Sequence, residues 1–148
     1  MPSRDSLVLF RRTPATLNRA RVRELAATLC EEVAAGRRFT CLVADDRELR
    51  RLNRDFLGLD RPTDVLSFPS GEEGGSLGDI AISAERAAEQ ARELGHPVEQ
   101  EIAILMLHGL LHLQGLDHHG DRGRMARAEA RWRKALGLPA GLIERVRR

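Results

Sequence analysis

Cysteine and aromatic residues are scarce in this chain of 148 residues. Cys30 and Cys41 are its only cysteines, tyrosine is absent, and aromatic side chains make up 3% of the sequence. Two cysteines without the close spacing of a metal-binding pair indicate buried thiols in a reducing cytosol rather than a disulfide framework. So few aromatic rings disfavour a surface that binds nucleic acid by stacking successive bases.

Long apolar runs are also missing. No run approaches the ~20 residues that a membrane-spanning helix needs, and the start of the chain, from Met1 to Asp5, lacks the apolar segment of a signal peptide. We therefore expect a cytoplasmic protein with no membrane partner. A hydrophobic content of 42% and a charged content of 31% are typical of globular proteins, and the length favours a single domain over residues 1–148.

Lysine is nearly absent, whereas arginine is abundant. Lys134 is the one lysine among 24 basic residues, and the formal net charge is +2. Arginine binds phosphate in a fixed fork, which suits a nucleic-acid partner, but the same skew also results from genomic base composition. One predicted helix carries arginines on its exposed face, which is either a solvated surface or a phosphate-facing patch: Arg47, Arg50, Arg51 and Arg54.

The apolar pattern predicts strands alternating with helices, followed by helices alone. Short runs rich in β-forming residues predict strands at residues 7–10, 39–44, 64–68 and 77–82. Helical spacing, capping residues and terminal glycines predict helices at residues 16–35, 46–54, 83–94, 97–114 and 121–136, and a short one after 139. We expect an α/β (α+β) fold, a small four-stranded mixed sheet packed with about five helices. The third and fourth strands can pair as a hairpin, and the helix after residue 97 should be buried.

That predicted helix concentrates the histidines of the chain. His108, His112 and His118 lie at relative positions 0, 4 and 10, and His119 follows directly. Residues four apart on an α-helix point from one face, so the first two imidazoles can bind one ion together. Gly115 is placed to end the helix, because glycine accepts the left-handed conformation. The chain can then return His118 as a third ligand.

Three protein ligands leave one coordination position open, as in catalytic rather than structural metal sites. We expect one zinc ion per chain, although nickel, cobalt or iron also bind imidazole. Zinc would lower the pKa of a bound water to about 7 and polarise a phosphoryl or carbonyl oxygen. Asp117 is either an acceptor that orients a ligand imidazole or a turn residue, and His119 is an exposed neighbour rather than a fourth ligand. The alternative is a run of partly buried core histidines.

The residue after the first histidine distinguishes this segment from a peptidase site. The skeleton H-x-x-x-H-x-x-G-x-x-H occurs in the metzincin proteases, which carry a glutamate general base where this chain has Gly109. The metal site is thus predicted without the peptidase base. Glycine costs about 1 kcal/mol relative to alanine inside a helix, so close packing or a need for space near the metal should explain Gly109.

Two further segments place polar residues at the ends of predicted strands. They are residues 61–69, from Arg61 to Pro69, and residues 77–80, with the sequence Leu-Gly-Asp-Ile. Thr63, Asp64 and Asp79 are candidates to line a cleft beside the metal. Residues of these types more often cap helices or accept hydrogen bonds in turns.

Four blocks of the sequence together resemble the YbeY family, whose members are bacterial rRNA-maturation endoribonucleases. The blocks are Leu52-Asn53, residues 62–69 (Pro-Thr-Asp-Val-Leu-Ser-Phe-Pro), residues 77–80 and residues 108–118. The resemblance implies a zinc-dependent, single-strand-specific endoribonuclease that acts in 16S rRNA 3′-end maturation and ribosome quality control. It also implies that His108, His112 and His118 are the zinc ligands, and that the fold is related to the metzincin catalytic core.

One position departs from the family pattern. The family carries Asn-x-x-(Tyr/Phe)-Arg-Gly ahead of the Pro-Thr-Asp block, and its arginine is considered functionally important, but this chain has Leu57 there. Leucine cannot bind phosphate, so either Arg54 or Arg61 replaces that arginine or the protein is a weakened nuclease. Arg61 is the better candidate, because it lies beside the Pro-Thr-Asp block.

The expected catalytic residues are His108, His112, His118, Arg61 and Asp79. Arg61 would neutralise charge that develops on the phosphate, and the general base is either Asp79 or hydroxide on the metal. The nucleophile is water or the 2′-hydroxyl of the RNA. The expected partners are single-stranded RNA, rRNA and the ribosome, and the expected state is a monomer or weak oligomer. The alternatives are a non-catalytic ribosome-assembly factor that binds RNA and holds a structural metal, and a metallopeptidase, which the missing glutamate disfavours.

Overall fold

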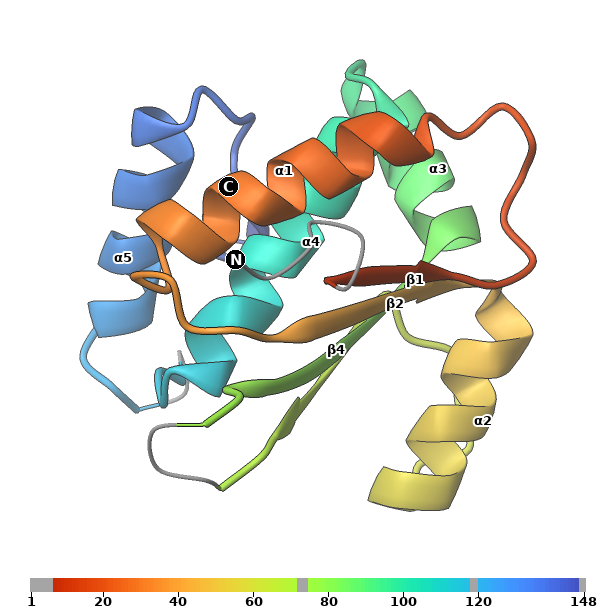
Figure 1. Cartoon of the computed structure of the whole chain (residues 1–148), viewed down its shortest axis with the longest axis horizontal. Coiled ribbons are helices and arrows are strands. Elements are labelled where there is room, and N and C mark those ends of the chain that lie inside the picture. The colour runs from red at the N-terminus through yellow and green to blue at the C-terminus, as the bar shows by residue number, and fades with distance from the viewer. Residues whose placement is uncertain (1–6, 72–74, 118–119, 147–148) are drawn as a thin grey trace.

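Four strands form one mixed sheet in the computed structural model, which describes residues 7–71, 75–117 and 120–146 (Figure 1). The strand order is β1-β2-β4-β3, with β1 at Val8–Phe10, β2 at Thr40–Ala44, β3 at Val65–Pro69 and β4 at Gly78–Ser83. β1, β2 and β4 run parallel, whereas β3 pairs antiparallel with β4, with Ser67 opposite Ile80. The predicted mixed sheet and the hairpin pairing of its last two strands are both confirmed.

Helices cover this sheet on both faces. In the described residues they are α1 (Arg19–Glu32), α2 (Asp46–Leu57), α3 (Ala84–Leu94), α4 (Val98–Leu113), α5 (Arg124–Ala135) and α6 (Leu142–Val146). Asp45 and Ser83 begin α2 and α3, because each side chain accepts a hydrogen bond from an N–H group in the first turn of its helix. Within the described part of the chain, no helix is both long and apolar enough to cross a membrane.

Four helix ends differ from the prediction by three residues: α1 begins later and ends earlier, α2 ends later, and α5 begins later. α1 begins after Asn18 rather than at Thr16, because the Asn18 side chain accepts a hydrogen bond from the N–H of Arg21 at 3.0 Å. α2 continues past residue 54 to Leu57 and ends at Gly58, which adopts the left-handed conformation with φ = 71°. Leu57 is therefore the last residue of a helix and not part of a loop.

α4 is the central helix of the protein. All of its residues from Glu101 to Leu111 are buried. The helix packs against β3 and β4 on one side and against α1, α3 and α5 on the others. The predicted buried helix is confirmed, and its burial extends to every side because other elements enclose it.

The two faces of the sheet are covered by different helices, with α2 on the opposite side from α1 and α4 (Figure 1). Ile80 and Ile82 of β4 point into the main core that includes α4, whereas Ala81 between them packs with Leu49 of α2. Neighbouring side chains on a strand point to opposite faces, so Asp79 lies on the α2 side. The sheet thus separates α2 from α4.

Candidate metal centre

His108 and His112 lie near the C-terminal end of α4, one helical turn apart. Their ring centroids are 4.8 Å apart and their planes are inclined by 76°, so the two imidazoles meet edge to face. His108 is buried, with 8% of its surface exposed, and His112 is partly buried. The structure brings these two side chains together as their four-residue spacing predicts.

A cavity of about 440 Å³ opens beside the two imidazoles. It lies between the C-terminal end of α4 and β3, and its described lining consists of Val65, Leu66, Ser67, Pro69, His108, His112, Gly115, Leu116 and Asp117. β3 is an edge strand, so the cavity lies at the margin of the sheet. Its volume is within the range of small-ligand sites.

The chain turns sharply after α4. Gly115 adopts φ = 91°, and its N–H donates to the carbonyl of His112 at 2.9 Å. A positive φ favours glycine, so the predicted role of Gly115 in ending this helical segment is confirmed. The turn brings Asp117 to the cavity. His118, the predicted third ligand, and its neighbour His119 lie outside the described residues, so their roles remain predictions.

A buried glutamate that the sequence analysis did not identify holds His108. Glu129 on α5 has no exposed surface, and its Oε2 lies 2.8 Å from Nδ1 of His108. Its other oxygen, Oε1, accepts a hydrogen bond from the N–H of Ile143 at 2.9 Å. One signal in the sequence could have identified it, because Glu129 follows Met125 by four residues and so shares the apolar side of α5.

Gly109 brings α4 close to the sheet. A Cβ at this position would lie 3.0 Å from Cγ2 of Ile80 and 3.1 Å from Oγ of Ser67. The Ser67 hydroxyl also donates to the carbonyl of Gly109 at 3.2 Å. Of the two explanations that the sequence offered for this glycine, the structure supports close packing. A glutamate here would have to displace side chains of both β3 and β4.

The loop between α2 and β3 carries Arg61, Thr63 and Asp64. Asn53, buried in α2, donates to the carbonyl of Arg61 at 3.1 Å, and Gln90 of α3 donates to Oδ2 of Asp64 at 3.2 Å. The Thr63 hydroxyl donates to a backbone carbonyl two residues further on. Thr63 and Asp64 thus hold the loop in place, and neither is among the described residues that line the histidine cavity. The side chain of Arg61 is exposed.

Asp79 lies on the other face of the sheet from the histidines. It accepts a hydrogen bond from the hydroxyl of Thr40, its neighbour on β2. The two residues line a second, mostly apolar cavity of about 430 Å³ between the sheet and α2. The expected place of Asp79 beside the metal ligands is therefore not observed, because alternation along β4 turns its side chain toward α2.

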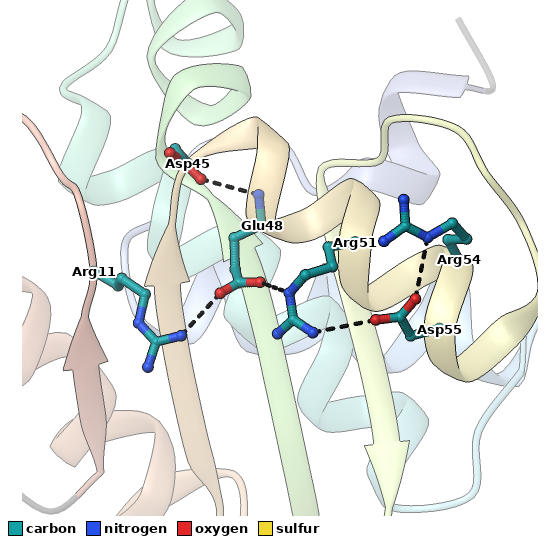
Figure 2. Close-up of polar contacts among 6 residues, drawn as sticks. All are labelled: Arg11, Asp45, Glu48, Arg51, Arg54 and Asp55. Atoms are coloured by element: carbon teal, nitrogen blue, oxygen red, sulfur yellow. Dashed lines mark hydrogen bonds and ion pairs between the residues drawn. The ribbon is translucent and has the colours of Figure 1, made fainter.

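Two arginines on the exposed face of α2, Arg51 and Arg54, are paired with acidic side chains (Figure 2). Glu48, which is buried, accepts hydrogen bonds from Arg51 and Arg11. Asp55 accepts from Arg51 at 3.2 Å and from Arg54 at 3.1 Å. The hydrogen bond from Arg51, helped by Arg11, lowers the pKa of Glu48 below its ordinary value of 4.5. These pairs favour a solvated surface over a phosphate-facing patch.

The place of the family arginine is occupied by an exposed side chain. Leu57, at the end of α2, is 49% exposed. Of the two possible substitutes, Arg54 is engaged with Asp55, whereas Arg61 lies in the loop that leads into β3, which lines the histidine cavity. Neither arginine is among the described residues that line the cavity, so which of them replaces the family arginine remains a prediction.

The donor set of the cavity fits a metal ion. The His108 ring is oriented by a buried carboxylate, which is the common arrangement for a metal-binding histidine, and His112 lies beside it. Within the described ranges, no group of three potential ligands is found, because the third predicted ligand lies outside them. Fold and site together define a small α/β protein with a candidate histidine metal centre at the margin of its sheet.

Comparisons with known proteins assign the chain to a family. The family model described as Endoribonuclease YbeY matches residues 10–137. A protein of Solibacter usitatus named Endoribonuclease YbeY is 63% identical over 141 residues, which cover 95% of each chain. Its namesake from Koribacter versatilis is 52% identical over 105 residues, covering 71% of this chain and 68% of that protein. The chain belongs to the YbeY family, as its motifs predicted.

A solved structure shares the fold. The solution structure of TM1509 from Thermotoga maritima is similar with a TM-score of 0.62 and 28% sequence identity. The similarity covers 88% of this chain and 90% of that one.

Proposed function

We propose that this protein is a zinc-dependent, single-strand-specific endoribonuclease that acts in 16S rRNA 3′-end maturation and ribosome quality control. The observation that carries the proposal is the His108–His112 pair beside an open cavity, with His108 bonded to a buried glutamate. The relatives named Endoribonuclease YbeY support ribonuclease chemistry. The zinc and the ribosomal role rest on the resemblance of the motifs to that family.

His108, His112 and His118 would hold the zinc ion through ring nitrogens. When bound, zinc supplies Lewis acidity to a phosphoryl oxygen. Arg61, from the loop ahead of β3, would neutralise the charge that develops on the phosphate. Asp79 has no place in this chemistry, because it lies across the sheet and bonds to Thr40.

The recessed position of the imidazoles supports a single-stranded substrate. His108 exposes 8% of its surface, so a scissile phosphate must enter the cavity between α4 and β3 to reach it. A flexible single strand can turn one nucleotide into such a cavity, whereas a duplex holds its phosphates in a stiff helix. This geometry supports the proposed preference for single strands.

Packing at Gly109 supports RNA rather than peptide as the substrate. A metzincin-like peptidase would need a glutamate at this position. Here the backbone of α4 lies so close to Ile80 and Ser67 that a Cβ would already be in tight contact. This position thus lacks the peptidase base, and a side chain there would require Ile80 and Ser67 to shift.

A paired assay tests the proposal. Bound metal is measured by elemental analysis, and cleavage is measured on a labelled single-stranded RNA and on its duplex. We expect zinc in the wild type, cleavage of the single strand alone, and loss of both metal and cleavage in His112→Ala. A folded, metal-free His112→Ala that cleaves as fast as the wild type would refute the catalytic metal.

Two further variants and the product ends define the chemistry. Arg61→Ala should slow cleavage at unchanged metal content, whereas its matched control Arg54→Ala should not, because Arg54 is held by Asp55.

A 2′,3′-cyclic phosphate on the product would identify the RNA 2′-hydroxyl as the nucleophile and exclude direct attack by water. In cells that lack the protein, 16S rRNA with an immature 3′ end should accumulate, and His112→Ala should not correct it.

A further inference from the structure

Glu129 joins two groups that lie far apart in the sequence. Its Oε2 is 2.8 Å from Nδ1 of His108, and its Oε1 is 2.9 Å from the backbone nitrogen of Ile143. The carboxylate has no exposed surface, so no water shell can replace these partners. Buried charged groups need such hydrogen bonds, and here each oxygen has one.

These contacts determine which nitrogen of His108 carries the proton. An ionised carboxylate can only accept hydrogen bonds, so Nδ1 of the imidazole must be the donor. In a neutral imidazole the lone pair is then on Nε2. Glutamine has the same shape as glutamate but offers one oxygen and one NH₂ group, so it cannot accept from both His108 and Ile143.

The turn before α6 leaves space for this carboxylate. A Cβ on Gly141 would lie 2.1 Å from Oε1 and 2.7 Å from Cδ of Glu129. Contacts this short are not tolerated, so any side chain at position 141 would displace the glutamate. The glycine, the glutamate and the histidine thus form one connected arrangement.

We propose that Glu129 is a positioning residue that fixes His108 as the Nδ1–H tautomer and presents its Nε2 to the metal ion. The inference rests on the proposed metal centre, since the ligand role of His108 belongs to that proposal. The sequence suggested Asp117 for such a task, and for His108 the task falls to Glu129. Loss of a carboxylate that orients a metal-binding histidine typically costs about 10–100-fold in metal affinity.

His96 provides an internal comparison. Its Nε2 lies 2.6 Å from Oε1 of Glu101, which is also fully buried. By the same reasoning His96 is the opposite tautomer, with the proton on Nε2. His96→Gln is therefore a matched control, because it removes the histidine of the other buried pair and leaves the bonds from Arg145 to Glu101 in place.

The tautomers can be observed directly in the metal-free protein. Two-bond ¹H–¹⁵N correlation spectra, recorded where imidazoles are neutral, distinguish the protonated ring nitrogen. We expect the Nδ1–H form for His108 and the Nε2–H form for His96 in the wild type. Glu129→Gln should change the pattern of His108 alone, and His96→Gln should remove the signals of His96 alone. A wild-type His108 in the Nε2–H form would overturn the proposal.

Zinc affinity provides the second measurement, by competition with a chromophoric chelator. We expect Glu129→Gln and Gly141→Ala to bind zinc about 10–100-fold more weakly than the wild type, and His96→Gln to bind it about as tightly as the wild type. Wild-type affinity together with a wild-type His108 tautomer in Glu129→Gln would refute the role. If Glu129→Gln does not fold, the zinc affinity of Gly141→Ala and the His108 tautomer of the wild type test the positioning role instead.

The two proposals can fail separately. If the wild type binds no zinc, the metal centre is wrong, while the spectrum of the metal-free protein still reports on the contact between Glu129 and His108. If the wild type binds zinc and Glu129→Gln binds it as tightly, the metal centre stands and the positioning role is wrong.

Discussion

At the residue scale, Leu57 is the position where this chain departs from its family. It ends α2 and is half-exposed, so nothing in its packing requires leucine. The neighbouring Leu59 is similarly exposed. An arginine could therefore occupy position 57 without disturbing the core, and we expect its absence to affect substrate binding rather than folding.

Leu57→Arg should increase cleavage of single-stranded RNA. A guanidinium that reaches a phosphate forms a charge-assisted hydrogen bond worth about 1.5–3 kcal/mol, which corresponds to roughly a tenfold or greater gain. The measurement is kcat/KM on a short labelled RNA. Leu59→Arg is the control, because it adds the same charge two residues away. Equal gains in both variants would indicate a general charge effect and contradict a specific role for position 57.

Local residue roles could be predicted from the sequence, and distant ones could not. His108 and His112 lie on one helix and Gly115 follows its end, so spacing and glycine conformation are enough to relate them. Glu129 reaches His108 only because α5 packs against α4, and no pattern in the sequence encodes that docking. A buried acid on an apolar helix side was the one available signal.

At the element scale, α2 is held by a carboxylate placed between arginines. Glu48 is 6% exposed and accepts from Arg51, one turn further along, and from Arg11 near the end of β1. The helix is thereby tied to the sheet edge by charge as well as by Leu49. Because the pKa of Glu48 is lowered in the folded state, this link should depend on pH.

We expect acid to weaken the protein through Glu48. Its folded-state pKa lies below the ordinary value of 4.5, so the unfolded state binds the proton more readily. The contribution is present above about pH 4.5 and is lost as the pH falls through the folded-state value. The free energy of unfolding, measured by urea denaturation at several pH values, should fall less steeply toward acid pH in Glu48→Gln than in the wild type. The control Glu24→Gln, at an exposed pair on α1, should keep the wild-type slope.

α6 is tied to α4 by a buried ion pair. Arg145 donates to both oxygens of Glu101, at 2.7 and 2.8 Å, and Glu101 has no exposed surface. Removing the arginine leaves a buried charge without its main partner. Such losses cost about 3–5 kcal/mol.

Arg145→Ala should therefore lower the free energy of unfolding strongly, as measured by urea denaturation. Arg133→Ala is the matched control, since Arg133 also donates two hydrogen bonds, from Nε and Nη2, to one glutamate, but its pair with Glu144 is about a quarter exposed. Water can solvate the remaining Glu144, so the loss should be smaller. Equal losses would contradict the role assigned to burial.

The sequence predicted the strands and helices, but it did not predict which helices cover which face of the sheet. The strands and most helix ends were predictable from apolar runs and caps. The position of Asp79 relative to the histidines could not be predicted. Both faces of β4 are covered, so the alternation of side chains along the strand does not show which face packs against α4. The sheet face was decided by packing between segments distant in the sequence.

At the scale of the whole molecule, the helix that carries the histidines is held by the apolar core. Its neighbours are the sheet, α1, α3 and α5. Domains that rely on a structural metal unfold when it is removed. The apolar core supports α4 without a metal, so we expect the fold to persist when the metal is removed.

A chelator should abolish RNA cleavage and leave the fold intact. We expect the far-UV circular dichroism at 25 °C to be nearly unchanged after zinc removal, because α4 keeps its apolar contacts. Adding zinc back should restore cleavage. Unfolding on chelation would instead support the alternative of a structural metal.

The hydrogen bond between Glu129 and Ile143 also predicts the effect of a C-terminal truncation. A stop codon after Ala140 would leave every predicted metal ligand in the translated chain. It would nevertheless remove the N–H that holds one oxygen of the glutamate, and Arg145 with it. A late nonsense mutation should thus inactivate this protein, although an inspection of its histidines would find nothing missing.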